Sequence, residues 1–566
     1  MRLGSGHRTV AEMSKAAARK RASELGDFTT GVQVIPISFL AILIGFAASY
    51  VAWLLLKLIG LFTNIFYYHR IDTALTSPAH NQLGIAAIAV PIIGSLIIGL
   101  MARFGSERIR GHGIPEAIES ILMNGSRVHP RLAILKPISA AISIGSGGPF
   151  GAEGPIIMTG GAFGSLIAQF FHLTAAERKT LLVAGAAAGM SATFAAPLSA
   201  VLLAVELLLF EWKPRSAIPV ALASATAGAT RRYILGLGPL FPVTSHPVFI
   251  GPEGLFGCVL TGILAGGLSA LLTVGVYAAE DFFQKLPIHW MWWPAIGGLF
   301  VGIGGFIFPP ALGVGYDNIA LLLKGNTALQ FLFGVLIVKS AIWMISLGSG
   351  TSGGVLAPLL MMGAALGGLE GMFLPHFGVG FWPLVSMGAI LGGTMRSPFT
   401  GIVFAIELTH DLNMLLPLLV ACFLAHAFTV LTLKRSILTE KIARRGYHLS
   451  REYALDPLEI LFVREVMQTG DNVPNGARPG QPVFAYSDEP LRVVVNRMAE
   501  TGVTEMPVVD RDNTARVLGA VSLGDLLRAR SRNLEEERAR ERVLRLHLPL
   551  GRAGRNGKPE TDVISE

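Results

Sequence analysis

Two parts of this chain, about 200 residues apart, repeat one another. Residues 136–164 and 339–367 can be aligned at an offset of 203, and 12 of the 29 positions are identical. Two further pairs keep nearly the same offset: 196–207 with 397–408, and 111–116 with 313–318. Three matched segments in one order indicate an internal duplication, with repeats at about 84–212 and 290–412. The chain must therefore fold into two halves of similar design.

The duplicated region has the composition of a membrane domain. Charged residues make up 15% of the 566 residues, whereas about a quarter is usual for a soluble domain, and they are sparse between Val32 and Leu433. Several apolar segments reach the ~20 residues that cross a bilayer. Others, such as 155–171, 196–210 and 355–372, are short and broken by glycine or proline. We therefore predict an all-α polytopic membrane protein whose discontinuous helices meet inside the bilayer, in repeats of opposite orientation.

The ends of the chain are charged and differ from the centre. We predict a basic N-terminal helix at 1–31, a membrane domain at 32–446, a small domain at 447–532, and a charged helix with a disordered tail at 533–566. No signal peptide is visible. The positive-inside rule places both termini in the cytoplasm. The net charge of +8 then has an explanation that requires no nucleic acid partner.

One acid stands out within the apolar region. Glu153 lies in GAEGP, and an intramembrane carboxylate indicates a functional site. The repeat pairs Glu153 with Leu356, so GAEGP corresponds to GVLAP; each is a glycine-rich turn that opens a helix. Such helix N-termini carry free amides and positive dipoles, which together can bind an anion. A cation site would need rings of carboxylates or carbonyls, and few acids lie in this region.

Five motifs resemble those of one family, the CLC chloride channels and chloride/proton exchangers. They are GHGIP (111–115), GAEGP (151–155), GVLAP (354–358), SPFTGIVFAIELTHD (397–411) and SILTEKIARRG (436–446). The resemblance covers about residues 30–446. It implies a homodimer in the lipid bilayer, with an inverted repeat and an anion pore in each subunit. It also implies transport of chloride or another small anion rather than an enzyme activity, no required cofactor, and a bacterial inner-membrane location.

The resemblance also implies which residues form the pore. Glu153 corresponds to the gating glutamate, whose carboxylate competes with the permeant anion. The anion-binding positions would be His112, Gly113, Ile114, Ala152, Gly154, Val355, Leu356 and Leu438. Three of them depart from the family pattern: His112 replaces serine, Leu356 replaces phenylalanine, and Leu438 replaces the inner-gate tyrosine. The central site would then depend mainly on the amides of Val355 and Leu356.

A further departure concerns proton transfer. The exchangers of this family use an inner glutamate, and its position is occupied here by Leu207, which cannot carry a proton. The adjacent Glu206 is turned by about 100° around a helix, and its repeat partner Glu407 suggests a structural role for both. The sequence therefore favours a voltage- or pH-gated chloride channel. A chloride/proton antiporter with a proton path through His112 remains open, and a CBS-regulated divalent-cation transporter is a distant third candidate.

The segment after the membrane domain has an α/β pattern. GVTEMPVVD (502–510) and GAVSLGDLL (519–527) resemble one CBS motif, with the expected order strand, helix, strand, strand, helix. CBS motifs work in pairs, so the second subunit could complete the pair. The resemblance implies that Gly519, Ser522 and Asp525 could contact the ribose and phosphate of an adenine nucleotide. A purely structural or dimerising module is an equal alternative.

Overall fold

The computed structural model describes residues 30–446 except 326, residue 458, residues 461–469, and residues 483–538 except 512, 514 and 515. The chain divides into two compact units, one of which is Gly26–Arg451 and the other of which contains Glu452 onward. Nearly all of the expected basic helix at 1–31, and the tail after residue 538, lie outside the described residues.

The membrane unit is helical throughout. Its α-helices are α2 Val34–Tyr68, α3 Ala89–Phe104, α4 Ile114–Leu122, α5 Pro130–Gly145, α6 Glu153–Gln169, α7 Ala175–Phe194, α8 Pro197–Leu203, α9 Pro214–Ile234, α10 Gly251–Gln284, α11 Trp293–Ile307, α12 Tyr316–Leu323, α13 Leu329–Phe333, α14 Ser340–Gly348, α15 Leu356–Glu370, α16 Phe381–Met395, α17 Pro398–Thr409, α18 Leu415–Thr432 and α19 Ile437–Arg444. Two π-helical segments, Ala204–Leu209 and Gly334–Lys339, continue α8 and α13. Among the described residues, six helical stretches are long and apolar enough to cross a membrane.

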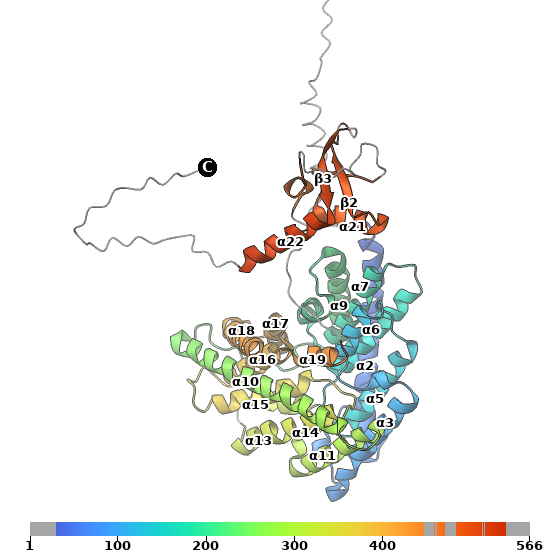
Figure 1. Ribbon diagram of the computed structural model, residues 1–566. Coiled ribbons are helices and arrows are strands. Elements are labelled where there is room, and N and C mark those ends of the chain that lie inside the picture. The colour runs from blue at the N-terminus through green and yellow to red at the C-terminus, as the bar shows by residue number, and fades with distance from the viewer. Residues whose placement is uncertain are drawn as a thin grey trace, which may run out of the picture. The chain divides into compact units, whose positions relative to one another are not determined.

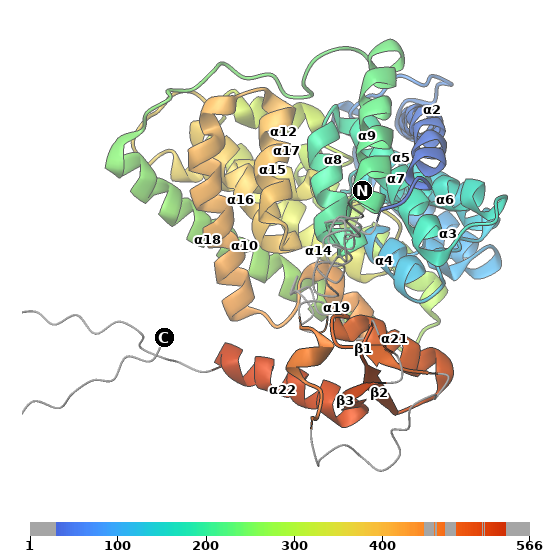
Figure 2. The same cartoon turned by 90° about the horizontal axis from the view of Figure 1, so that it is seen from above.

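The duplication is visible in the architecture. The helices of the first repeat, in blue and teal, gather on one side of the membrane unit, and those of the second, in yellow and orange, on the other (Figure 1). Helices α4, α6, α7 and α8 of the first repeat correspond to α12, α15, α16 and α17 of the second. The two halves meet where α8 packs against α17 (Figure 2). The predicted polytopic helical fold with an internal repeat is confirmed.

Two buried lysines show how closely the halves agree. The Lys136 ammonium donates hydrogen bonds to the carbonyls of Ile109 and Gly111, at 2.8 and 2.7 Å. Lys339 is its counterpart in the second repeat, and it donates to the two carbonyls 202 positions further along, at 3.1 and 3.0 Å. Both lysines are fully buried. Each therefore fixes the loop that precedes α4 or α12.

Small residues allow helices α6 and α7 to pack closely. α7 is rich in alanine and glycine, and it packs along α6. A Cβ atom at Gly160 would lie 2.3 Å from the Gly185 carbonyl oxygen, and one at Gly185 would lie 2.2 Å from the Gly160 carbonyl oxygen. Only glycine at both positions allows this approach, which is a common way to pack membrane helices. The packing fixes α6, whose first residue is Glu153.

The C-terminal unit has the predicted order of elements. It consists of β1 Ala485–Tyr486, α21 Leu491–Thr501, β2 Glu505–Val509, β3 Val517–Ser522 and α22 Leu523–Arg538. The sheet order is β1-β2-β3, with β1 parallel and β3 antiparallel to β2. Residues such as Val494, Met506 and Val521 form its own apolar core. From the sequence we expected the small domain to end at residue 532 and a separate charged helix to begin at 533. Instead, α22 continues through this boundary to Arg538 as one helix.

Candidate functional site

The three glycine-rich loops of the membrane unit are joined by backbone hydrogen bonds. The Gly111 amide donates to the Thr351 carbonyl at 2.8 Å. Gly151 and Gly354 exchange two such bonds, at 3.1 and 2.9 Å. The loops that open α4, α6 and α15 therefore meet in one place, although about 240 residues separate the first from the last.

Glycine is required where two of these loops touch. Gly113 has a φ of +91°, and a Cβ atom there would lie 2.3 Å from the Gly154 carbonyl oxygen. A Cβ atom at Gly154 would lie 1.7 Å from the His112 carbonyl oxygen. The GHGIP and GAEGP loops are thus in direct backbone contact. The predicted residues Gly113 and Gly154 are brought together, and the His112 carbonyl lies against Gly154.

Glu153 begins α6 and is fully buried. Neither of its carboxylate oxygens has a hydrogen-bond partner of normal geometry among the described residues. The groups that face it are the Tyr316 hydroxyl, which also lacks a partner, the Ala357 amide and the Lys339 ammonium. A buried carboxylate without partners is costly, so it needs a proton, a water molecule or a conformational change to be accommodated. Glu153 therefore has the surroundings of a group that changes state.

His112 belongs to the GHGIP loop, which contacts the GAEGP loop that carries Glu153. Its side chain is almost completely buried, with 3% of the residue exposed, and Nδ1 has no hydrogen-bond partner among the described residues. His112 also lines a cavity of about 630 Å³ that reaches the GHGIP loop. The ring is thus placed between the interior of the protein and this cavity.

The remaining predicted positions are all buried, but they are not equally placed to bind an anion. Val355 caps α15 and Leu356 is its first residue, and Ala152 occupies the same position before α6. Ile114 begins α4. The Gly113 amide, however, already donates to the Glu116 carboxylate at 2.8 Å, so this amide is not available to an anion. Leu207 lies in the π-helical segment after α8 and Leu438 in the first turn of α19, outside the three loops.

The cavity is lined by charged side chains of both signs. Five of them are cationic and three are the acids Glu107, Glu119 and Glu280. The cations are Arg108, Arg110, Lys441, Arg444 and Arg445. Among the described residues, each of these cations except Arg108 forms an ion pair with an acid. The cavity is therefore a polar space that reaches the loop that carries His112.

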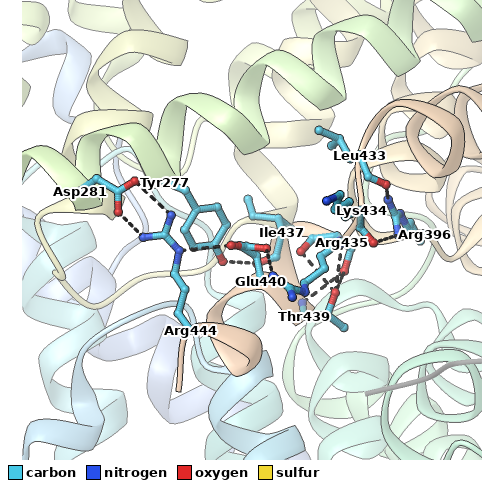
Figure 3. A network of polar contacts seen from close by, with 11 residues as sticks. Tyr277, Asp281, Arg396, Leu433, Lys434, Arg435, Ile437, Thr439, Glu440 and Arg444 are labelled. Atoms are coloured by element: carbon cyan, nitrogen blue, oxygen red, sulfur yellow. Dashed lines mark hydrogen bonds and ion pairs between the residues drawn. The ribbon is translucent and has the colours of Figure 1, made fainter. Parts of the chain in front are cut away.

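A network of polar contacts holds α19 beside this cavity (Figure 3). The Tyr277 hydroxyl donates to the Ile437 carbonyl at 2.5 Å, and Arg444 forms a bidentate ion pair with Asp281. Arg444 and Arg435 also pair with Glu440, at 3.3 and 3.2 Å. These contacts fix α19 to α10, and so they also fix the α19 residues that line the cavity.

One of those residues is Lys441. Its ammonium lies 2.6 Å from the Glu116 carboxylate, in an ion pair where Glu116 is only 4% exposed. Lys441 and the buried Lys136 both act electrostatically on His112, and so does Glu116. Sequence reasoning missed Lys136, Lys339, Lys441 and Tyr316. The alignment of Lys136 with Lys339 at the start of the repeated segments was a usable signal for the first two.

The predicted nucleotide-binding residues of the C-terminal unit already have partners. One Asp525 oxygen accepts hydrogen bonds from the Ser522 amide and hydroxyl, at 2.8 and 2.6 Å. The other accepts from Gln468 at 2.9 Å and from Arg528. Burial alone would raise the pKa of Asp525, but these hydrogen bonds outweigh it and lower the pKa below its usual range. Gly519 is closely packed against Gln468, since a Cβ atom there would lie 2.3 Å from the Gln468 carbonyl oxygen.

Curated relatives share the sequence of the membrane unit. The chain is 31% identical over 340 residues to "H(+)/Cl(-) exchange transporter ClcA" of Yersinia pestis, which covers 57% of this chain and 70% of the relative. It is 32% identical over 341 residues to the protein of the same name from Salmonella arizonae, with 57% and 71% covered. These names belong to the exchanger alternative rather than to the channel that the sequence favoured.

Solved structures share the fold. A slow cyanobacterial Cl⁻/H⁺ antiporter aligns with a TM-score of 0.63 at 22% identity, covering 72% of this chain and 97% of its own. A CLC-type fluoride/proton antiporter aligns at 0.61 with 18% identity, covering 71% and 97%. A eukaryotic CLC transporter aligns at 0.60 with 17% identity, covering 87% and 98%.

Family models agree with these relatives. The model described as voltage-gated chloride channel matches residues 93–430, and the CBS domain model matches 463–532. The first match covers more than half of the chain and contains all three glycine-rich loops. The chain is therefore a member of the CLC family of anion-transporting membrane proteins, with a CBS domain in its C-terminal unit.

Proposed function

We propose that this protein exchanges chloride for protons across the membrane. The observation that carries the proposal is Glu153: a fully buried carboxylate at the junction of three helix N-termini, with no hydrogen-bond partner of normal geometry for either oxygen among the described residues. An ionised Glu153 can occupy the place of an anion at those N-termini. A protonated Glu153 releases that place and carries a proton at the same time. One side chain thus couples the two ions.

The helix N-termini supply the anion site, and the cavity supplies the approach to it. The amides at the start of α4, α6 and α15 have no acceptor within their own helices. Among the predicted positions, Ile114, Ala152, Gly154, Val355 and Leu356 lie at these starts, and His112 adds a ring nitrogen. Leu438 would limit the pore sterically, since it has no hydroxyl group. Chloride is the anion in the relatives' names, and we propose it as the main substrate.

The same proposal includes the oligomeric state, the membrane and the orientation of the protein. The protein would act as a homodimer with one pore in each subunit, in a bacterial inner membrane, with both termini and the cavity on the cytoplasmic side. The CBS domain of one subunit would pair with that of the other. The hydrogen bonds at Asp525 favour a structural or dimerising role for it over nucleotide binding.

A chloride channel is the second candidate. It is favoured by Leu207, which is fully buried and apolar at the position where the exchangers of the family keep an acid. The divalent-cation alternative has no such support: the described residues contain no group of three or more His, Cys, Asp and Glu side chains that could hold a metal ion.

The two candidates differ in one measurement. Purified protein in proteoliposomes is given an outward chloride gradient in a weakly buffered medium, and external chloride and pH are recorded together. In an exchanger, chloride that leaves the vesicles drives protons into them, although no proton gradient was imposed. The external pH therefore rises while chloride leaves. Chloride efflux at a constant external pH, with the membrane potential clamped, would show a channel.

A further inference from the structure

The proposed exchange requires a proton to reach Glu153, and Glu153 does not reach the cavity by itself. It is fully buried, and it is absent from the residues that line the 630 Å³ cavity. A proton that travels between the cavity and this carboxylate needs an intermediate carrier. Leu207 cannot serve, because a leucine side chain has no titratable group.

The acids near the cavity are engaged in other contacts. Glu116 uses one carboxylate oxygen to pair with Lys441 at 2.6 Å and the other to accept the Gly113 amide at 2.8 Å. Glu119 pairs with Arg445, and Glu107 pairs with Arg110 at 3.1 Å. These three acids therefore already have partners, and Glu280, the other acid that lines the cavity, lies on α10, outside the loops that hold His112 and Glu153.

His112 has the geometry that the carrier needs. Its residue lines the cavity, while its Nδ1 is buried and has no partner. Nε2 also forms no hydrogen bond among the described residues, so neither ring nitrogen is committed. Its carbonyl touches Gly154, the residue that follows Glu153. An imidazole can accept a proton at one nitrogen and release one from the other.

The charges around His112 link this proton to the anion. Burial opposes a positive ring most strongly, Lys441 on α19 and Lys136 on α5 oppose it further, and Glu116 on α4 favours it. Two cations against one acid leave an excess of positive charge, so the imidazolium forms most readily when an anion lies nearby. Proton uptake by His112 and anion binding at the loops should therefore reinforce one another.

We propose that His112 is the proton carrier between the cavity and Glu153. This inference rests on the proposed exchange function. A neutral ring with hydrogen on Nδ1 accepts a proton from cavity water at Nε2 and becomes an imidazolium. It then releases the Nδ1 proton, and the Glu153 carboxylate accepts it. The products are a neutral ring with hydrogen on Nε2 and a protonated Glu153.

The test measures the ratio of protons to chlorides moved by the full-length protein in proteoliposomes. His112→Asn keeps a polar group of similar size but cannot titrate, and we expect its ratio to fall at least tenfold below that of the wild type. His172→Asn is the matched control, because His172 is exposed and lies outside the site; its ratio should equal that of the wild type. Leu207→Glu, added to His112→Asn, should restore part of the ratio by supplying another proton carrier.

Each outcome has a separate meaning. If the wild type moves chloride without protons, the exchange function is wrong, and the inference falls with it. If the wild type is coupled and His112→Asn keeps the wild-type ratio, exchange stands and His112 is not the carrier. If His112→Asn and His112→Gln both abolish chloride transport together with proton transport, His112 belongs to the anion site alone, and the inference is overturned.

Discussion

Glu206 and Glu407 cap each other's helices. The Glu206 carboxylate accepts hydrogen bonds from the amides of the second and third residues of α17, at 3.3 and 2.9 Å, and α17 carries Glu407. The Glu407 carboxylate accepts from the amides of the second and third residues of α8, at 2.9 and 2.8 Å, and the continuation of α8 carries Glu206. A reciprocal contact between matched positions is the mark of a two-fold axis between the halves. It agrees with the structural role that the repeat suggested for both acids.

The reciprocal capping by Glu206 and Glu407 predicts that removing either carboxylate lowers the stability of the fold and leaves the ratio of protons to chlorides unchanged. Glu206→Gln loses charge-assisted hydrogen bonds at the start of α17, so the folded state should lose about 1–3 kcal/mol. Thermal unfolding in detergent should show a lower midpoint for Glu206→Gln and, by symmetry, for Glu407→Gln. The ratio of protons to chlorides should stay at the wild-type value. A lost ratio with an unchanged midpoint would make Glu206 a proton carrier instead.

The buried pair of Glu116 and Lys441 predicts a second stability effect. Lys441→Met leaves the Glu116 carboxylate buried and without its cation, which should cost about 3–5 kcal/mol. The double variant Lys441→Met, Glu116→Gln removes the uncompensated charge and should regain part of that loss. Thermal midpoints of the two single variants, the double variant and the wild type measure the coupling. Additive losses would show that the pair contributes no interaction of its own.

His112 predicts that anion binding depends on pH. An imidazolium beside the loops attracts an anion more strongly than a neutral ring does. Burial opposes the imidazolium and a bound anion favours it, so chloride affinity should rise as the pH falls from about 8 to 5.5, most steeply at the acid end of that range. Calorimetric titration with chloride measures this best in a Glu153→Gln background, which removes the competing carboxylate. His112→Ser in the same background should give a flatter dependence. Equal affinities and equal slopes in the two proteins would place the ring away from the anion.

Asp525 predicts a pH dependence for the CBS domain. Hydrogen bonds lower its pKa in the folded state, against the opposing effect of burial, below the ~3.9 of an unfolded chain. A group with a depressed folded pKa contributes stability above the unfolded value and loses it as the pH falls through the folded value. The segment 455–550 should thus lose stability from about pH 5 downward, and Asp525→Asn should lose less over the same range. Parallel curves for the two proteins would contradict the assignment.

The same segment tests the alternative of nucleotide binding. A ligand that binds only the folded state raises its thermal midpoint. Because both Asp525 oxygens already accept hydrogen bonds, we expect ATP and AMP to leave the midpoint unchanged. A rise with either nucleotide that disappears in Asp525→Ala would restore the nucleotide site.

The apolar segments, the repeat and the resemblance of the motifs to one family together predicted the fold, because few architectures satisfy all three. The offset of about 202 residues predicted the matched helices, and the pairing of GAEGP with GVLAP predicted that helix N-termini converge. The contacts from outside the motifs could not be predicted in this way. Tyr316 faces Glu153 because α12 packs against α15, and the loop before α15 is hydrogen-bonded to the loop before α6. Lys441 reaches Glu116 across 325 residues of sequence. The occupied Gly113 amide had a usable signal that was missed, because Glu116 follows Gly113 by three residues, which is the spacing of a capping box.

Glu153 carries the central claim, which is that one carboxylate gates the anion and carries the proton. The most direct test is simultaneous recording of chloride efflux and external pH in proteoliposomes that contain Glu153→Gln. The glutamine cannot ionise, so it neither competes with the anion nor accepts a proton. We predict that chloride flux persists or rises, that its pH dependence weakens, and that the proton flux disappears. Proton movement coupled to chloride at the wild-type ratio in Glu153→Gln would contradict the account.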